Sequence, residues 1–516
     1  MNAPSLAEWQ NWRTDFNRLP FVRTVPNADF PQTWSPWWQH SPFSTLLETG
    51  KGGRYTILAP RIEKLLSCSE TSANRLQLEN GKLTTTKTTT DSPIEFIRSE
   101  IEKERAPKIP GSPPFLGGWI GYLSYDLVRL FEKIPSIAKP DLDVPLALFG
   151  LAEEVFIFDH LQKKLFCAVH FKSTPETSDA ELELGYQAAF EKTVSMAREW
   201  KKHAATAESN PRIPKSAPAA APSATASFSF AKEDFIAAVK KIQNYIDSGE
   251  TDQVNLSVRE SRPLRATPEA VYEKLRSINP SPYMGLLRLP GLSLVCGSPE
   301  LLVKVRDKKI ETRPIAGTRP RGSDEISDKL LADELIENQK ERREHLMLVD
   351  LIRADLEKVS EKESVQVTEF MTVERYSHVM HIVSHVEGKL REEAAPFDAI
   401  QAVFPGGTIT GTPKTRTLQI IEELEPVRRG PYTGSIGWIG FSGNLELNIA
   451  IRTLLALNQM AHVQAGAGIV TESDPEREYE ESINKGRALW AAVEAAETET
   501  VPPLRGKIGP PGRPQR

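Results

Sequence analysis

Cysteine is scarce in this chain of 516 residues, and its scarcity excludes two kinds of structure. The three cysteines, Cys68, Cys167 and Cys296, lie far apart in the sequence, and no CxxC pair occurs. A disulfide framework and a cysteine zinc site both need closely grouped cysteines, so neither is indicated. We therefore expect free thiols in a reducing compartment.

Long apolar runs and an excess of one charge are missing as well. No stretch of about 18 uninterrupted apolar residues occurs, so we expect no membrane-spanning helix. The first residues show no basic segment followed by an apolar run, so a signal peptide is not indicated. Lys and Arg number 64 against 69 Asp and Glu, which leaves no basic surface typical of nucleic-acid binding. These absences predict a soluble cytoplasmic protein with neither nucleic-acid nor membrane partners.

The chain does contain enough apolar material for a large core, because 39% of its residues are hydrophobic. Two segments differ from the rest. Residues 204–227, AATAESNPRIPKSAPAAAPSATAS, contain almost no large apolar side chains and predict a flexible linker. Residues 499–516 are rich in Pro and Gly and predict a disordered tail. These segments separate an N-terminal region, residues 1–203, from a second region, residues 228–498.

Hairpin patterns alternate with helical patterns along the chain. Strand runs with short turns between them occupy residues 146–171, 284–315 and 434–470. Helical periodicity marks residues 232–248, 328–358 and 478–494. Strands joined by hairpins, with helices between the sets, predict an α+β fold with antiparallel sheets.

Two helical segments carry similar acidic pairs. Glu341 and Glu344 are three residues apart and share a helix face, as do Glu478 and Glu481, with Lys485 one turn further along. Carboxylates from two helices that face one cavity suit Mg²⁺, which completes its shell with waters and substrate oxygens. The commoner explanation of such pairs is a solvated helix face. Apolar runs directly after each pair favour the metal site.

Glycine-rich turns stand at three predicted strand ends, residues 314–319, 405–411 and 464–468. Glycine lets backbone N–H groups approach an anion closely, although glycine in a strand more often marks a bulge. Neither a P-loop nor a GxGxxG fingerprint is present. With Arg452 and Lys485, the turns fit a small polycarboxylate ligand. His381 lies among apolar residues, where a core histidine is the commoner explanation.

Taken together and in order, the motifs resemble those of the chorismate-utilising enzymes over nearly the whole chain. The motifs are GGWIGYLSYDL (117–127), DQVNLSVR (252–259), GSPELLV (297–303), ETRPIAGTRPRG (311–322), EHLMLVDLIRADL (344–356), YSHVMHIVSHVEG (376–388), FPGGTITGTPKTRTLQIIEELEP (404–426), YTGSIGW (432–438), IAIRTL (449–454), QAGAGIV (464–470) and EYEESINK (478–485). The resemblance implies two large antiparallel sheets packed with helices around one extended core. It also implies that residues 228–498 form the chorismate-binding catalytic domain.

The resemblance implies a metal and a substrate site. Glu344 and Glu481 would hold Mg²⁺, and Glu341 and Glu478 would support it through waters. Glu300 would be the general acid that protonates the departing C4 hydroxyl. The other implied residues surround the substrate: His381 beside it, Lys485, Arg452, Tyr432, Gly466 and Gly468 at its carboxylates, and Gly317 and Thr318 along its ring.

Within the family, the residue at position 253 separates two chemistries. Water-using members have a lysine there, whereas this chain has Gln253, a neutral amide that cannot act as a base. The resemblance therefore implies ammonia as nucleophile, supplied by a separate glutamine amidotransferase subunit. FPGGTITGTPK resembles the enzymes that make 4-amino-4-deoxychorismate for p-aminobenzoate and folate. Ala316 is also found in anthranilate synthases, so anthranilate remains the alternative product.

Overall fold

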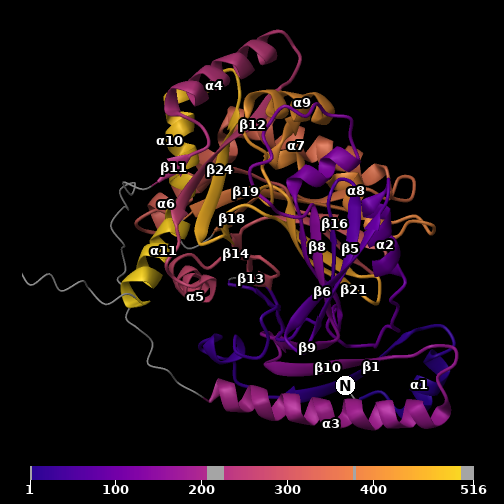
Figure 1. Ribbon diagram of the computed structural model, residues 1–516. Helices are drawn as coiled ribbons and strands as arrows, with labels where there is room; N and C mark the ends of the chain where they lie inside the picture. Colours follow the sequence, from indigo (N-terminus) through magenta and orange to yellow (C-terminus); the bar gives the residue numbers. More distant parts are fainter. Residues whose placement is uncertain (1–2, 51, 206–225, 376–378, 501–516) are drawn as a thin grey trace, which may run out of the picture.

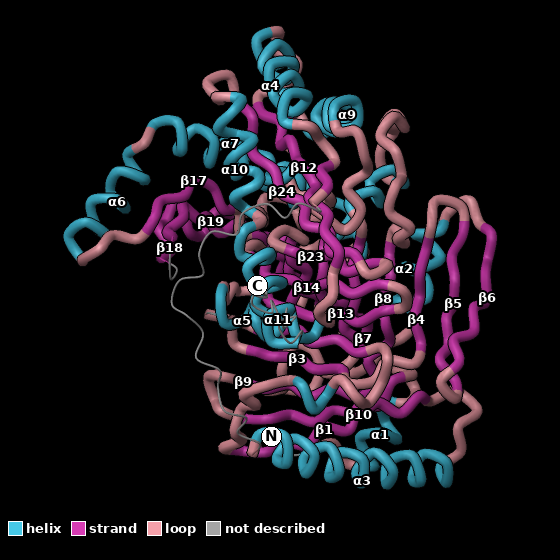
Figure 2. The backbone as a smooth tube through the Cα atoms, turned by 60° about the vertical axis from the view of Figure 1, so that its left-hand side comes forward, coloured by secondary structure: helices cyan, strands magenta, loops and turns pink. Residues whose placement is uncertain are grey.

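The computed structural model describes residues 3–50, 52–205, 226–375 and 379–500. Most of the predicted linker and tail lies outside these residues. The described chain forms two twelve-stranded antiparallel sheets with helices around them, which confirms the predicted fold class (Figures 1 and 2). The three cysteines are buried free thiols, as expected.

Strands from both ends of the chain build the first sheet. In spatial order it contains β1 (Arg18–Pro26), β10 (Lys164–Lys172), β9 (Glu154–Asp159), β3 (Tyr55–Ala59), β2 (Ser44–Glu48), β13 (Tyr283–Leu289), β14 (Leu292–Ser298), β23 (Thr453–Leu457), β24 (Met460–Ile469), β12 (Gln253–Pro263) and β11 (Ser227–Phe228), and β20 (Gly411–Thr412) pairs with β12.

The second sheet mixes the two regions in the same way. Its order is β17 (Ile315–Pro320), β19 (Val379–Lys389), β16 (Lys309–Thr312), β15 (Leu301–Arg306), β22 (Leu445–Ile449), β21 (Ser435–Gly440), β7 (Gly118–Leu123), β8 (Ala147–Ala152), β4 (Lys64–Cys68), β5 (Ser72–Glu79) and β6 (Lys82–Thr89), and β18 (Gln366–Arg375) pairs with β19. Because both sheets contain strands from residues 1–203 and from residues 228–498, the two regions share their sheets.

Helices cover the sheets on their outer faces and ends. They are α1 (Leu6–Trp12), α2 (Pro93–Glu102), α3 (Asp179–Ala204), α4 (Lys232–Asp247), α5 (Pro268–Ile278), α6 (Glu325–Glu337), α7 (Gln339–Glu357), α8 (Pro396–Val403), α9 (Lys414–Leu424), α10 (Pro475–Lys485) and α11 (Arg487–Thr500), with short 3-10 turns η1 (Ser35–Trp37), η2 (Tyr125–Leu130) and η3 (Gly407–Ile409). The long helix α3 packs on β10 and β1 along the lower edge of the molecule (Figure 1).

Several predicted elements are divided in the structure. The apolar run 146–159 forms β8 and β9, which belong to different sheets, and the run 446–457 likewise divides into β22 and β23. The helical stretch 328–358 is two helices, because Asn338 ends α6 and its side chain caps the first N–H groups of α7. The predicted final helix divides at Gly486 into α10 and α11.

Candidate active site

Every site residue predicted above lines a single cavity of about 460 Å³. Strands β12 and β24 of the first sheet form one side, and β17 and β19 of the second sheet form another. Helices α7 and α10 bring the four glutamates to it. The structure therefore brings together residues that lie up to 185 positions apart, from Glu300 to Lys485.

Two crossings of the chain between the sheets supply Glu300 and Arg452. Glu300 lies between β14 and β15, and Arg452 lies between β22 and β23. The crossings are antiparallel neighbours, because β14 pairs with β23 and β15 pairs with β22. The Ile449 N–H donates to the Glu300 carbonyl at 3.0 Å, and the Gly297 N–H donates to the Arg452 carbonyl at 3.0 Å. These two backbone hydrogen bonds hold the two crossings side by side.

Burial changes the protonation of Glu300. Its side chain is enclosed, with the residue 5% exposed, and this burial raises the pKa of the carboxyl to about 7. A carboxyl with such a pKa is substantially protonated near neutral pH and can donate a proton. The environment therefore fits the general-acid role that the sequence suggested.

Arg452 and Lys485 form the cationic end of the cavity. Arg452 has a φ of +50°, a left-handed conformation that costs a non-glycine residue of the order of 1 kcal/mol. Its guanidinium donates to the Lys485 carbonyl, and the Lys485 ammonium donates to the Gly466 carbonyl at 2.9 Å. Burial lowers the pKa of Arg452, so an anionic ligand beside it would be stabilised.

Two glycines of β24 leave the strand backbone open to the cavity. Gly468 lies opposite Asn255 and Gly466 opposite Ser257 in the β12–β24 ladder. A Cβ on Gly468 would lie 2.2 Å from the Gln253 amide nitrogen, and one on Gly466 would lie 2.4 Å from the Leu256 carbonyl. A side chain at Gly466 would clash with backbone, and one at Gly468 would have to displace the Gln253 side chain.

A bulge in β17 positions the ring-lining residues. Gly317 has a φ of +63° at a register shift between Ala316 and Thr318. The Gly317 carbonyl lies 3.2 Å from His381 Nδ1, and Thr318 Oγ1 lies 3.0 Å from the same nitrogen. Because a carbonyl only accepts, Nδ1 carries the proton, and burial lowers the pKa of His381 so that the ring is neutral.

The four glutamates form an acidic group at the mouth of the cavity. Burial raises the pKa of Glu344 to about 6, and the charges of Glu341 and Glu478 add to the rise. Burial and the charge of Glu481 likewise raise the pKa of Glu478. Mutual repulsion in a group of carboxylates is the condition that a divalent cation relieves, so this donor set fits Mg²⁺.

The glutamates also have cationic neighbours. Glu341 pairs with Arg319 at 3.0 Å, and Glu481, which is exposed, pairs with Lys485 at 2.7 Å. No three of these four glutamates, all within the described residues, have carboxylate oxygens that lie within 4.8 Å of one another. A metal ion would therefore have to draw them closer.

A family model described as chorismate binding enzyme matches residues 55–491. The chain belongs to this family. It is 41% identical to aminodeoxychorismate synthase component 1 of Bacillus subtilis, over 94% of this chain and 99% of that protein. It is 38% identical to anthranilate synthase component 1 of Acetivibrio thermocellus, over 96% and 99%.

Solved structures of the family have the same fold. Anthranilate synthase component I of Streptococcus pneumoniae matches with a TM-score of 0.68 and 33% identity, over 85% of this chain and 92% of that one. The menaquinone-specific isochorismate synthase of Escherichia coli matches with a TM-score of 0.63 at 17% identity, over 95% and 98%, which shows the fold alone. No helix in the described ranges of this family member is long and apolar enough to span a bilayer.

Sequence reasoning identified Gln253 but missed two further amides of this cavity, Asn255 and Gln464. The side-chain oxygens of Gln253, Asn255 and Gln464 are buried and have no hydrogen-bond partner among the residues the structure describes. All three residues line the cavity. Side chains alternate between the two faces of a strand, so these residues of β12 and β24 lie on the same sheet face as Gly466 and Gly468. This alternation can be read from the sequence and could have identified them.

A buried guanidinium beneath the cavity was also missed. Arg429 pairs with Glu425 at 2.7 Å and donates to the Asn255 carbonyl at 2.7 Å and the Ile409 carbonyl at 2.9 Å. Its guanidinium carbon lies 5.6 Å from the centre of the Tyr432 ring. Asn255, Ile409 and Tyr432 all line the cavity, so one side chain supports three parts of its wall.

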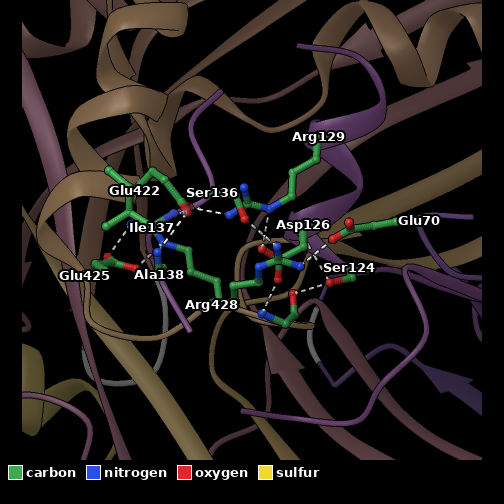
Figure 3. Close-up of polar contacts among 12 residues, drawn as sticks. Glu70, Ser124, Asp126, Arg129, Ser136, Ile137, Ala138, Glu422, Glu425 and Arg428 are labelled. Carbon is green, nitrogen blue, oxygen red and sulfur yellow. Dashed lines mark hydrogen bonds and ion pairs between the residues drawn. The ribbon is translucent and has the colours of Figure 1, made fainter. Parts of the chain in front are cut away.

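Polar contacts next to Arg429 join this wall to the N-terminal region (Figure 3). Asp126 accepts from the Gly430 N–H at 2.8 Å, and Ser124 donates to the Gly430 carbonyl at 2.8 Å. Glu422 accepts from the N–H groups of Ile137 and Ala138 and pairs with Arg129. Residues 124–138 therefore help to fix the segment that leads to Tyr432.

Replacing Glu300 tests its raised pKa. Above pH 7 a buried ionised carboxyl costs the folded state up to about 3 kcal/mol relative to its ordinary pKa of 4.5. Because its folded pKa is raised, wild-type stability falls as pH rises from about 4.5 to 7. We expect Glu300→Gln to lose roughly 10²–10⁴-fold in turnover. The melting temperature of Glu300→Gln minus that of the wild type should increase from pH 5 to pH 8.

The exposed Glu337→Gln serves as the control and should show no such trend. A difference in melting temperature that does not change with pH would contradict the raised pKa of Glu300.

A methyl group on Gly468 tests the close approach of backbone and cavity. Gly468→Ala must displace the Gln253 amide, a movable side chain, so we expect the protein to fold. We expect kcat/KM for chorismate to fall by roughly 100-fold, because small displacements at a reacting centre have effects of that order. The control is Gly440→Ala, whose Cβ meets nothing closer than 3.4 Å. Equal kinetics for the two variants would refute the steric argument.

Proposed function

We propose that the chain replaces the C4 hydroxyl of chorismate with an amino group, giving 4-amino-4-deoxychorismate for p-aminobenzoate and folate synthesis. The observation that carries the choice of nucleophile is the wall built by Gln253, Asn255 and Gln464. Their buried amide oxygens accept hydrogen bonds and suit the N–H donors of ammonia. None of them is a base that would activate water.

The residues of the cavity divide the task between binding and proton transfer. Arg452, Lys485 and the backbone at Gly466 and Gly468 suit the substrate carboxylates, and Tyr432 adds a buried wall. Gly317 and Thr318 suit the ring, with neutral His381 beside it. Protonated Glu300 transfers its proton to the C4 oxygen, so the hydroxyl leaves as water when the C4–O bond breaks.

Mg²⁺ belongs to this proposal as the cofactor. Glu344 and Glu481 would hold it, with Glu341 and Glu478 supporting through waters. When bound, it supplies a Lewis acid for a substrate carboxylate. The raised pKa of Glu344 and the repulsion among the glutamates support this assignment.

Ammonia would come from a separate glutamine amidotransferase subunit. The two relatives from Bacillus subtilis and Acetivibrio thermocellus carry the name component 1, which implies a second component. Free ammonium at high pH should replace that subunit in an assay, because ammonium then loses a proton to give neutral ammonia, the nucleophile.

The second candidate product is anthranilate, for tryptophan synthesis. Anthranilate synthases are as similar to the chain as the Bacillus subtilis protein, at 38% to 43% identity. Ala316, which lines the cavity, also fits that reaction. Some aminodeoxychorismate synthases have a lysine at this position, and this chain does not.

Product identity decides between the two. The purified chain is incubated with chorismate, Mg²⁺ and ammonium at high pH, and products are followed by fluorescence and mass spectrometry. We expect a product that becomes p-aminobenzoate only when an aminodeoxychorismate lyase is added. Anthranilate formed without the lyase would assign the chain to tryptophan synthesis.

The metal assignment is tested by neutralising one carboxylate. Glu344→Gln removes a ligand charge, so we expect at least a tenfold rise in the Mg²⁺ concentration needed for half-maximal turnover, with little change in melting temperature. Glu357→Gln, an exposed position on the same helix, is the matched control and should behave as wild type. Unchanged Mg²⁺ dependence in Glu344→Gln would remove this residue from the metal site.

A further inference from the structure

Two histidines and a glutamate meet at the C-terminal end of α3, outside the cavity. Glu199 and His203 are four residues apart on α3 and therefore share one helix face. His40 comes from the loop between η1 and β2. In Figure 1 this end of α3 lies at the lower left, where the described chain stops before residue 206.

The three side chains are close enough to share one ion. One ligand atom from each lies within 4.8 Å of the others, and His40 Nε2 is 3.1 Å from the nearer Glu199 oxygen. The two imidazole rings are 6.0 Å apart, and the Trp37 ring lies 4.7 Å from His203 and 5.8 Å from His40. The buried indole therefore forms an apolar backing behind both imidazoles.

The donor set selects the kind of ion. Two imidazole nitrogens and one carboxylate oxygen are ligands of Zn²⁺ and similar divalent transition metals, whereas Mg²⁺ prefers oxygen ligands alone. Bonds of about 2.0–2.1 Å in a tetrahedron place ligand atoms roughly 3.4 Å apart. The observed spacing needs adjustments of about 1 Å, which side-chain rotation provides.

A second cluster of the same kind is a weaker candidate. Glu311, His385 and Glu387 also have ligand atoms within 4.8 Å of one another. Lys304 and Lys309 both pair with Glu311, however, and Lys309 also pairs with Glu387. A cation would have to displace two ammonium groups there. No lysine or arginine is paired with Glu199 among the described ion pairs.

We propose that His40, Glu199 and His203 bind one Zn²⁺ or similar divalent transition metal, with water as the fourth ligand. The ion fastens the loop after η1 to the end of α3. Since β2 starts at Ser44, four residues after His40, the metal also holds the start of that strand of the first sheet. Without metal, the His40–Glu199 contact is a partly exposed pair, ionic only when His40 is protonated, and contributes at most about 1 kcal/mol.

The test measures binding of the metal alone. The full chain is stripped with a chelator and titrated with Zn²⁺ by calorimetry, and Co²⁺ is used in parallel because its visible spectrum reports tetrahedral coordination. We expect one micromolar or tighter site in the wild type. His203→Ala and Glu199→Gln should lose at least 100-fold in affinity for it, more than the loss caused by removing an outer-shell partner.

Glu191→Gln, at an exposed position two turns earlier on α3, is the matched control and should bind Zn²⁺ as the wild type does. Thermal melting gives a second readout, because a metal that binds only the folded chain raises the melting temperature. Zn²⁺ should raise it in the wild type and in Glu191→Gln but not in His203→Ala. Equal Zn²⁺ affinity in wild type and His203→Ala, or binding only at millimolar Zn²⁺, would overturn the proposal.

Discussion

Two neighbouring chain crossings between the sheets hold the cavity together. One crossing carries Glu300 and the other carries Arg452, and hydrogen bonds between their backbones fix the distance between acid and cation. Ser298 strengthens the connection, because its hydroxyl donates to the Ile449 carbonyl at 2.6 Å. Because each crossing ends one strand in each sheet, neither sheet can move without moving a residue of the cavity.

This arrangement explains how a charged site exists between two sheets with apolar cores. Burial raises the pKa of Glu300 to about 7, which favours its neutral form, and Arg429 is paired with Glu425 and donates to backbone carbonyls. The remaining charges gather at the mouth, where the glutamates of α7 and α10 lie near Arg319, Arg452 and Lys485. A dianionic substrate arriving with a divalent cation satisfies both signs at once.

Much of this structure could be predicted from the sequence. Turn residues and alternation gave the hairpins, such as β13–β14, and the motif residues gave the content of the cavity. The division of the runs 146–159 and 446–457 could not be predicted, because apolar side chains continue on both sides of each crossing. Arg429 was missed since it acts mainly on backbone carbonyls. The cluster at His40 was missed because its members lie about 160 positions apart and meet only through the packing of α3.

The proposed function requires that one cavity between the two crossings binds chorismate and Mg²⁺ together. Calorimetric titration of chorismate into the full chain without ammonium, at increasing Mg²⁺ concentrations, tests it most directly. We expect chorismate affinity to rise with Mg²⁺ concentration, and Arg452→Met to weaken binding at every Mg²⁺ concentration. Chorismate binding that is independent of Mg²⁺ and unchanged by Arg452→Met would contradict it.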